Sequence, residues 1–395
     1  MTENVIVANA SRTQHTINDP KVRGIIYQVI ALVLVAIGIF WVVNNTIVNL
    51  ERANIASGFG FFNARAGFDI SQTVLSFSSD SSYGWALVIG FLNTVQVAVA
   101  GIVTATILGF IIGLGRLSSN QLISKLCAIY VEVFRNIPPL LIVFFLYVGV
   151  ISSLPKVQQS IALPFSIFIN NRGVSLPVPV FGDAGNHAFG ALVAALLLST
   201  LLFWWSKRRQ AATGYRFPSL WISVALIVLL PLIVIFATEG RISFDIPQLG
   251  RFRLEGGIRI APEFLSLFAA LSLYTAAYIA EIVRSGIMGI THGQTEAAQA
   301  LGLSSSQTTR LVVVPQALRV IIPPLTSQYL NLMKDSSLAI AVGYADIVSV
   351  GGTIINQTGQ AIEVISIWAL VYLGLSLAAS GFMNWFNSKI ALVER

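Results

Sequence analysis

Long apolar runs separated by polar stretches dominate the hydropathy pattern of the chain. A helix needs about 20 apolar residues to cross roughly 30 Å of hydrocarbon, because it rises about 1.5 Å per residue. The runs that meet or approach this length cover residues 25–43, 85–114, 126–151, 187–206, 220–237, 262–282 and 362–386. The pattern therefore predicts an all-α integral membrane protein.

A further span is hidden in residues 315–342, where polar side chains interrupt the apolar pattern. Gln328, Asn331 and Asp335 stand at positions i, i+3 and i+7, which share one face of a helix. Such a face can be buried among neighbouring helices. We therefore expect about eight transmembrane helices, the alternative being seven spans in which residues 315–342 do not cross.

Composition supports a membrane location, since 55% of the 395 residues are hydrophobic and only 10% are charged. Soluble globular chains carry roughly 25% charged residues. The net charge of +7 is attributed to cytoplasmic loops through the positive-inside effect, and no nucleic-acid partner is expected. This rule predicts two cytoplasmic termini. The four arginines in the outer loop 238–261 oppose it, but the cluster from Lys207 to Arg209 directly abuts a span.

The single cysteine and the three scattered histidines argue against a disulfide or a metal site. No G-x-x-x-x-G-K-[ST] run occurs, so the chain lacks the phosphate-binding loop of the corresponding ATPases. We expect no catalytic residues, no bound cofactor and no metal in this chain. Energy for any active transport must come from another subunit.

The cytoplasmic segment 285–315 has the pattern of two short helices joined by a glycine bend. Residues 294–301 are good helix formers, Gly302 is a stop signal, and Ser304 begins a cap region for the next helix. Leu301, Leu303 and Leu311 would give this polar loop an apolar surface. The loop is a candidate docking element, and an ordinary amphipathic connector is the alternative.

These residues resemble a known family. Glu296-Ala-Ala, then Gly302, then the stretch Pro315-Gln-Ala-Leu-Arg319 is similar to the EAA loop of permease subunits in binding-protein-dependent, ATP-driven (ABC) importers. Other stretches resemble the polar amino-acid, histidine/glutamine-type branch of that family. They cover residues 90–94, 132–140, 278–286 and 332–338.

The resemblance implies a five-helix type I importer core within a larger chain. We expect a cytoplasmic tail at 1–24, an added first transmembrane helix at 25–43, a periplasmic loop at 44–84, a transporter domain at 85–388 and a cytoplasmic tail at 389–395. The domain would contain an insertion at 152–261 with two extra helices, and a coupling loop at 285–315. This enlargement is similar to the general L-amino-acid permeases of Gram-negative bacteria.

In that family the loop docks on an ATP-binding subunit and moves with it. The resemblance assigns polar interface contacts to Glu296, close approach to Ala297 and Ala298, and the bend to Gly302. The implied partners are two ATP-binding cassette subunits, a second permease that is a different chain, a periplasmic amino-acid-binding protein and the lipid membrane. The implied location is the bacterial inner membrane.

Several charged or polar residues in or near the spans are candidates for a pathway or gating role. Glu281 and Arg284 are three residues apart and can pair on one helix face, with a purely structural ion pair as the alternative. Intramembrane Lys334 and Asp335 suggest function by default, and Asn331 shares the face of Asp335. Arg135 precedes the Pro138-Pro139 break, where a cation can meet a substrate carboxylate or extend to the interface.

The sequence thus predicts a permease subunit of an ATP-driven importer that moves polar or general L-amino acids by alternating access. An ion-coupled secondary transporter or channel is the alternative. It would use the charges at Glu281, Lys334 and Asp335 to couple ions to substrate, and its halves should be inverted repeats, which the sequence does not display.

Overall fold

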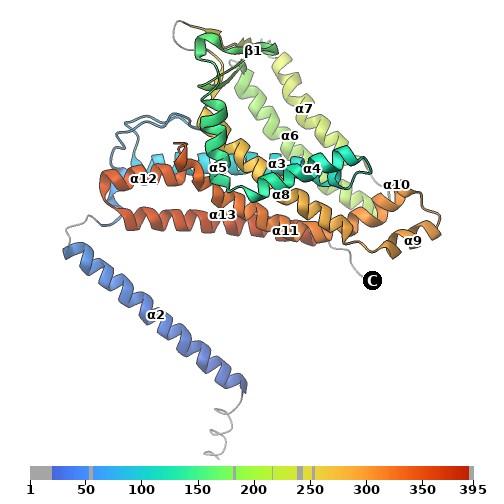
Figure 1. Cartoon of the computed structure of the whole chain (residues 1–395), viewed down its shortest axis with the longest axis horizontal. Helices are drawn as coiled ribbons and strands as arrows, with labels where there is room; N and C mark the ends of the chain where they lie inside the picture. Colours follow the sequence, from blue (N-terminus) through green and yellow to red (C-terminus); the bar gives the residue numbers. More distant parts are fainter. Residues whose placement is uncertain are drawn as a thin grey trace, which may run out of the picture.

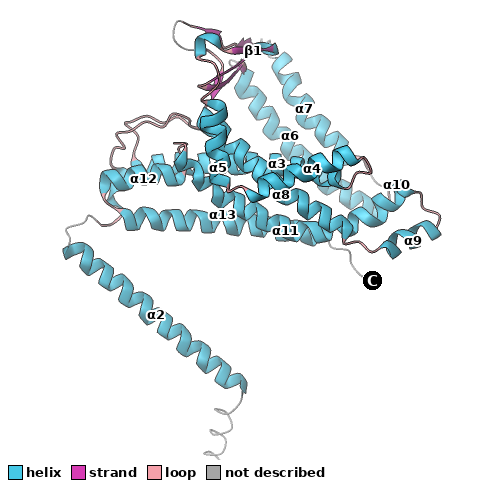
Figure 2. Cartoon of the chain, in the orientation of Figure 1, coloured by secondary structure: helices cyan, strands magenta, loops and turns pink. Residues whose placement is uncertain are grey.

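The computed structural model of the chain describes residues 20–52, 57–180, 184–215, 217–237, 243–250 and 254–390. Most of the predicted amino-terminal tail and the residues after 390 lie outside this part. Helices dominate the described residues, and short strands gather at one end (Figures 1 and 2).

Each predicted apolar run is helical, apart from a break at residues 137–138 within the run 126–151. The long helices are α2 (Pro20–Arg52), α3 (Tyr83–Arg116), α6 (Ala184–Thr213), α7 (Ser219–Ala237), α8 (Pro262–Met288), α11 (Val314–Asp335) and α13 (Ala361–Ile390). The shorter helices are α4 (Gln121–Asn136), α5 (Pro139–Phe144), α9 (His292–Ala300), α10 (Ser305–Thr308) and α12 (Ile347–Thr358). Short 3₁₀ or π turns are η1 (Phe59–Asn63), η2 (Phe145–Ile151), η3 (Val157–Gln159), η4 (Pro164–Ser166), η5 (Thr309–Val313) and η6 (Ser336–Ala341).

Six helices in the described residues are long and apolar enough to cross a membrane, or seven if α4 and the α5–η2 segment form one broken span. Helix α11 falls outside this count because of its polar residues. It nevertheless packs along α8 and α13, and Ile321 and Leu325 on it are buried. Its 22 residues are long enough for a crossing, so an eighth span at α11 stays a prediction.

Helices α3 and α8 form the centre of the bundle. Their contact uses the small residues Ala105, Gly109 and Gly113, which recur every four residues and are all buried. A Cβ added at Gly109 would lie 2.5 Å from Cγ2 of Ile279, and one at Gly113 would lie 2.8 Å from the backbone oxygen of Ala280. Small residues on this face therefore admit a close helix, since the backbones approach too closely for larger side chains.

The third predicted span is not a straight helix. Helix α4 and the α5–η2 segment meet at an angle of 107°. The break falls at Ile137 and Pro138, which are both extended. Proline disfavours a helical conformation at the preceding residue and lacks an N–H for the helical ladder. The break that the sequence places at Pro138-Pro139 therefore divides the run 126–151 into two helices that leave the proline pair in different directions.

The insertion contains β-structure that the apolar pattern did not predict. Strands β1 (Ile161–Leu163), β2 (Ile167–Asn170), β3 (Gly173–Leu176) and β8 (Ile258–Ile260) form an antiparallel sheet in that order. Two smaller ribbons pair β4 (Val178–Val180) with β5 (Ser243–Asp245), and β6 (Gln248–Leu249) with β7 (Leu254–Glu255). The insertion therefore combines the expected helices α6 and α7 with a strand-rich cap.

Helices α6 and α7 pack against each other as a hairpin beside the core (Figure 1). Helix α2 stands apart from the bundle in the same view, and the apolar window that it presents is 0% buried. That α2 and the α6–α7 hairpin are additions to a core of α3, α4–α5, α8, α11 and α13 stays a prediction.

Candidate functional site

The predicted coupling loop forms two short helices, α9 and α10, joined by a tight bend. Gly302 has φ +81, and the N–H groups of Gly302 and Leu303 donate to the carbonyls of Gln299 and Ala298 at 2.9 and 3.2 Å. This pair of backbone hydrogen bonds is the Schellman motif, in which glycine is favoured at the position with left-handed backbone angles. The bend therefore depends on the backbone freedom of Gly302.

The second helix of the loop begins with a capping box. The side chain of Ser304 accepts from the N–H of Gln307, and the side chain of Gln307 accepts from the N–H of Ser304 at 2.9 Å. Across the loop, the amide of Gln316 donates to the side chain of Gln294 at 3.2 Å. These bonds fix the two helices relative to the start of α11.

The residues assigned to the coupling surface differ in exposure. Glu296 and Ala297 are exposed on α9, whereas Ala298 is buried within the chain. Leu301 is 83% exposed at the bend. The loop therefore presents a carboxylate, a small residue and a large apolar side chain to the outside, while Ala298 packs α9 on its own chain.

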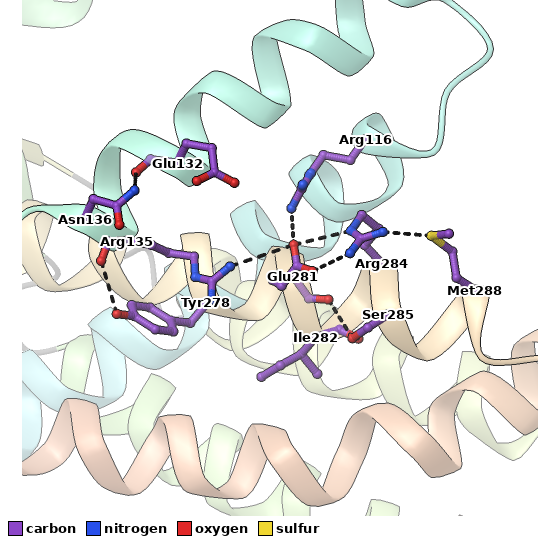
Figure 3. Close-up of polar contacts among 10 residues, drawn as sticks. All are labelled: Arg116, Glu132, Arg135, Asn136, Tyr278, Glu281, Ile282, Arg284, Ser285 and Met288. Carbon is purple, nitrogen blue, oxygen red and sulfur yellow. Dashed lines mark hydrogen bonds and ion pairs between the residues drawn. The ribbon is translucent and has the colours of Figure 1, made fainter.

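Glu281 lies at the centre of a charge cluster near the ends of three helices (Figure 3). Its carboxylate forms ion pairs with Arg116 of α3 and Arg284 of α8, and Arg135 of α4 lies 4.0 Å away. The side chain of Glu281 is 25% exposed. One carboxylate thus faces three guanidiniums, so the cluster joins α3, α4 and α8 and has a surplus of positive charge.

Arg135 connects this cluster to a tyrosine on α8. Its guanidinium carbon lies 5.3 Å from the centre of the Tyr278 ring, and the Tyr278 hydroxyl donates to the Arg135 carbonyl at 3.4 Å (Figure 3). A guanidinium above an aromatic ring is attracted by the ring quadrupole. Arg135 is therefore held over α8 at the point where the third span breaks.

A cavity of about 300 Å³ lies between α8 and α11, on the polar face that the sequence predicts for α11. It is lined by Tyr274, Thr275, Tyr278, Gln328, Asn331 and Asp335. The Tyr274 hydroxyl donates to that of Tyr278 at 3.2 Å. The cavity therefore offers one carboxylate, two amides and several hydroxyls to a small polar molecule.

The structure brings some sequence candidates together and separates others. Asn331 and Asp335 share the cavity, and Arg135 does not line it but lies against Tyr278, which does. Lys334 is exposed and does not line the cavity. The sequence analysis did not predict Tyr274 and Tyr278 as site residues. Their four-residue spacing on an apolar helix does place both hydroxyls on one helix face.

No cluster of three or more histidine, cysteine or acidic side chains with metal-binding geometry occurs among the residues that the structure describes. The chemistry available in the α8–α11 cavity is therefore hydrogen bonding and charge pairing by side chains.

Comparison with known proteins gives consistent matches. The family model described as "Binding-protein-dependent transport system inner membrane component" matches residues 205–392. The general L-amino acid transport system permease protein AapQ of Rhizobium johnstonii is 60% identical over 95% of this chain and 94% of that protein.

Two further relatives extend over nearly the whole chain. The putative amino-acid ABC transporter permease protein YhdX of Escherichia coli is 46% identical, over 95% of this chain and 96% of its own. The glutamate/glutamine/aspartate/asparagine transport system permease protein BztB of Rhodobacter capsulatus is 41% identical, over 97% of both chains.

Proposed function

The chain belongs to the amino-acid ABC transporter permeases, of the binding-protein-dependent inner-membrane family, and we propose that it moves polar and general L-amino acids inward by alternating access. It is a multi-pass permease subunit with a type I importer core. Membership of the family implies an ATPase, a substrate-binding partner and a membrane. The chain is a transporter subunit and not an enzyme in its own right.

The observation that supports a substrate pathway through this subunit is the polar cavity between α8 and α11. Its volume of about 300 Å³ is large enough for a single amino acid. In our proposal the Asp335 carboxylate accepts hydrogen bonds from the ammonium group of the substrate. The side-chain amides of Gln328 and Asn331 form hydrogen bonds with the other polar atoms of the substrate. The guanidinium of Arg135, which lies over the ring of the lining residue Tyr278, attracts the carboxylate.

Recognition of this kind would be broad. All L-amino acids share an ammonium and a carboxylate, so a cavity that binds these two groups discriminates little between side chains. The relatives AapQ and BztB are described as transporting general L-amino acids and four acidic or amide amino acids, respectively. Selectivity would then be shared with the periplasmic binding protein.

The coupling step in our proposal uses the α9–α10 loop. Glu296 and Leu301 project from the loop and would seat in a groove on an ATP-binding subunit, while the Gly302 bend transmits its movement to α8 and α11. Two ATP-binding subunits would bind ATP, with no cofactor on this chain. A second, different permease chain would complete the assembly, with both termini of this chain in the cytoplasm.

Reconstituted transport tests the proposal. The complete complex in proteoliposomes, with ATP inside and the binding protein outside, should take up labelled L-glutamine only with ATP. Asp335→Asn keeps the shape of the side chain and removes its charge. It should lower uptake roughly tenfold or more, because a hydrogen bond to a charged group is worth about 1.5–3 kcal/mol.

Ser327→Ala, on the same helix but outside the cavity, is the matched control and should leave uptake within about twofold of the parent. Full uptake by an assembled Asp335→Asn complex would reject the role of this carboxylate. Uptake without ATP would favour the ion-coupled transporter instead.

A further inference from the structure

The end of the α6–α7 hairpin that contains the Lys207–Arg209 run has an unusual arrangement of cations on aromatic rings. The guanidinium carbon of Arg208 lies 3.8 Å from the centre of the Trp204 ring. That of Arg209 lies 5.2 Å from Trp205, 5.9 Å from Tyr215 and 5.8 Å from Phe217. Phe217 also meets Trp205 edge to face at 5.3 Å. We call these six residues the hairpin tip.

The sequence around the hairpin tip carries no acidic residue. Residues 184–238 contain no Asp or Glu, whereas Lys207, Arg208, Arg209 and Arg216 all lie in that stretch. Among the described residues, no carboxylate pairs with the guanidinium of Arg208 or Arg209. Stacking occupies the face of a guanidinium and leaves its N–H donors at the edge free to bond a planar or tetrahedral anion.

The surroundings of the hairpin tip are apolar. Trp204 is 56% exposed, Trp205 45% and Tyr215 63%. Along the rest of the hairpin, Leu197, Leu201 and Leu229 are at least half exposed, because α6 and α7 pack mainly on each other. Exposed leucines on a membrane helix face lipid, and tryptophan and tyrosine are enriched at the level of lipid headgroups.

We propose that the hairpin tip is a binding site for the phosphate headgroup of an anionic phospholipid. Arg208 and Arg209 bond the phosphate oxygens, Lys207 adds a third positive charge, and the rings of Trp204 and Trp205 hold the guanidiniums at headgroup depth while the acyl chains lie along the leucines of the hairpin. Basic clusters beside membrane helices bind anionic headgroups in this way. The site does not depend on the transport function.

Native mass spectrometry of the complete detergent-purified complex tests the site directly. The complex is titrated with cardiolipin, phosphatidylglycerol or phosphatidylethanolamine, and inorganic phosphate is added as a competitor. We expect the two anionic lipids to bind in preference to phosphatidylethanolamine. Replacing Lys207, Arg208 and Arg209 together by Gln should lower their apparent affinity by roughly 100-fold, because each cation near an anionic surface contributes about fivefold.

Two variants separate the site from general electrostatics. The double change Arg208→Lys and Arg209→Lys keeps the charge that sets topology but loses the planar stacking, and should still weaken anionic lipid binding several-fold. The matched control replaces three exposed cations elsewhere, Lys125, Arg310 and Lys389, by Gln, and should change affinity by less than about threefold.

Equal binding of anionic lipids and phosphatidylethanolamine would overturn the proposal. An equal loss of affinity for anionic lipids in the control triple variant would also overturn it, because the effect would then come from net charge alone. Full displacement of the lipid by millimolar inorganic phosphate would assign the site to a free anion and not to a lipid.

Discussion

At the residue scale, Gly302 connects a backbone angle to a function. Its φ of +81 places it in the region that glycine adopts freely, and no atom lies within 4 Å of a Cβ built there. A substitution at Gly302 therefore tests the backbone conformation of the bend, because a side chain there meets no steric clash. A non-glycine residue in the left-handed region costs about 1–2 kcal/mol, least for asparagine and most for β-branched residues.

We expect Gly302→Val to leave membrane insertion intact and to uncouple ATP hydrolysis from uptake, because the Schellman bend opens. Gly302→Asn is the matched control, and it should retain most of the coupling. The ratio of amino acid transported to ATP hydrolysed in proteoliposomes measures the effect. If the valine variant transports as efficiently as the parent, the bend has no role in coupling.

Glu281 is the second residue whose role follows from its contacts. It pairs with Arg116 and Arg284 and approaches Arg135, so Glu281→Gln would remove the negative charge that these three guanidiniums face. We expect a loss of about 1–2 kcal/mol in stability, at the low end for charged hydrogen bonds because the site is partly exposed.

The thermal unfolding midpoint of the purified complex is the measurement for this variant. Combining Glu281→Gln with Arg116→Gln should recover part of the loss, because fewer like charges then remain. Should the double variant be less stable than the single one, repulsion among the arginines is not the cause.

At the element scale, the sequence predicts the helices and the Pro138-Pro139 break, but not every contact between distant helices. The polar face of α11 could be predicted because Gln328, Asn331 and Asp335 recur at helical spacing, and the cavity lies on that face. Only part of the charge cluster around Glu281 could be predicted from the sequence. The spacing of Glu281 and Arg284 indicates an ion pair, but nothing local indicates that Arg116, 165 residues away, joins it.

The strands of the insertion were missed for a different reason. They are two to four residues long, too short for an alternating pattern to stand out among apolar runs. The β2–β3 hairpin did leave a turn signal, Asn171 followed by Arg172 and Gly173. The positive φ of Gly173 and its approach to the Ile260 carbonyl, 2.0 Å from a built Cβ, require glycine there.

The α3–α8 contact makes a prediction at this scale. Gly113→Val would place side-chain atoms where the Ala280 carbonyl and Val283 already lie, so we expect overpacking to cost about 1–3 kcal/mol. Gly374→Val in α13 is the matched control, because no atom lies within 4 Å of its added Cβ. Detergent stability by fluorescence-detected size exclusion compares them, and equal stability of the two variants would mean that the helices separate at no cost.

At the scale of the whole molecule, the crossing of α11 decides the topology. After replacement of Cys127, single cysteines at positions 208 and 307 should react with a membrane-impermeant thiol reagent from the cytoplasmic side. Cysteines at 172 and 357 should react from the periplasmic side. Labelling of position 357 from the cytoplasm would remove the crossing of α11 and leave the seven-span arrangement.

The central claim also concerns the whole molecule: this chain is one subunit of an ATP-driven importer. The tagged chain should be purified in mild detergent from its native membranes, and all retained proteins identified by mass spectrometry. We predict an ATP-binding subunit with a G-x-x-x-x-G-K-[ST] loop and a second permease chain. A chain that purifies alone and moves amino acids in liposomes without ATP would contradict the account.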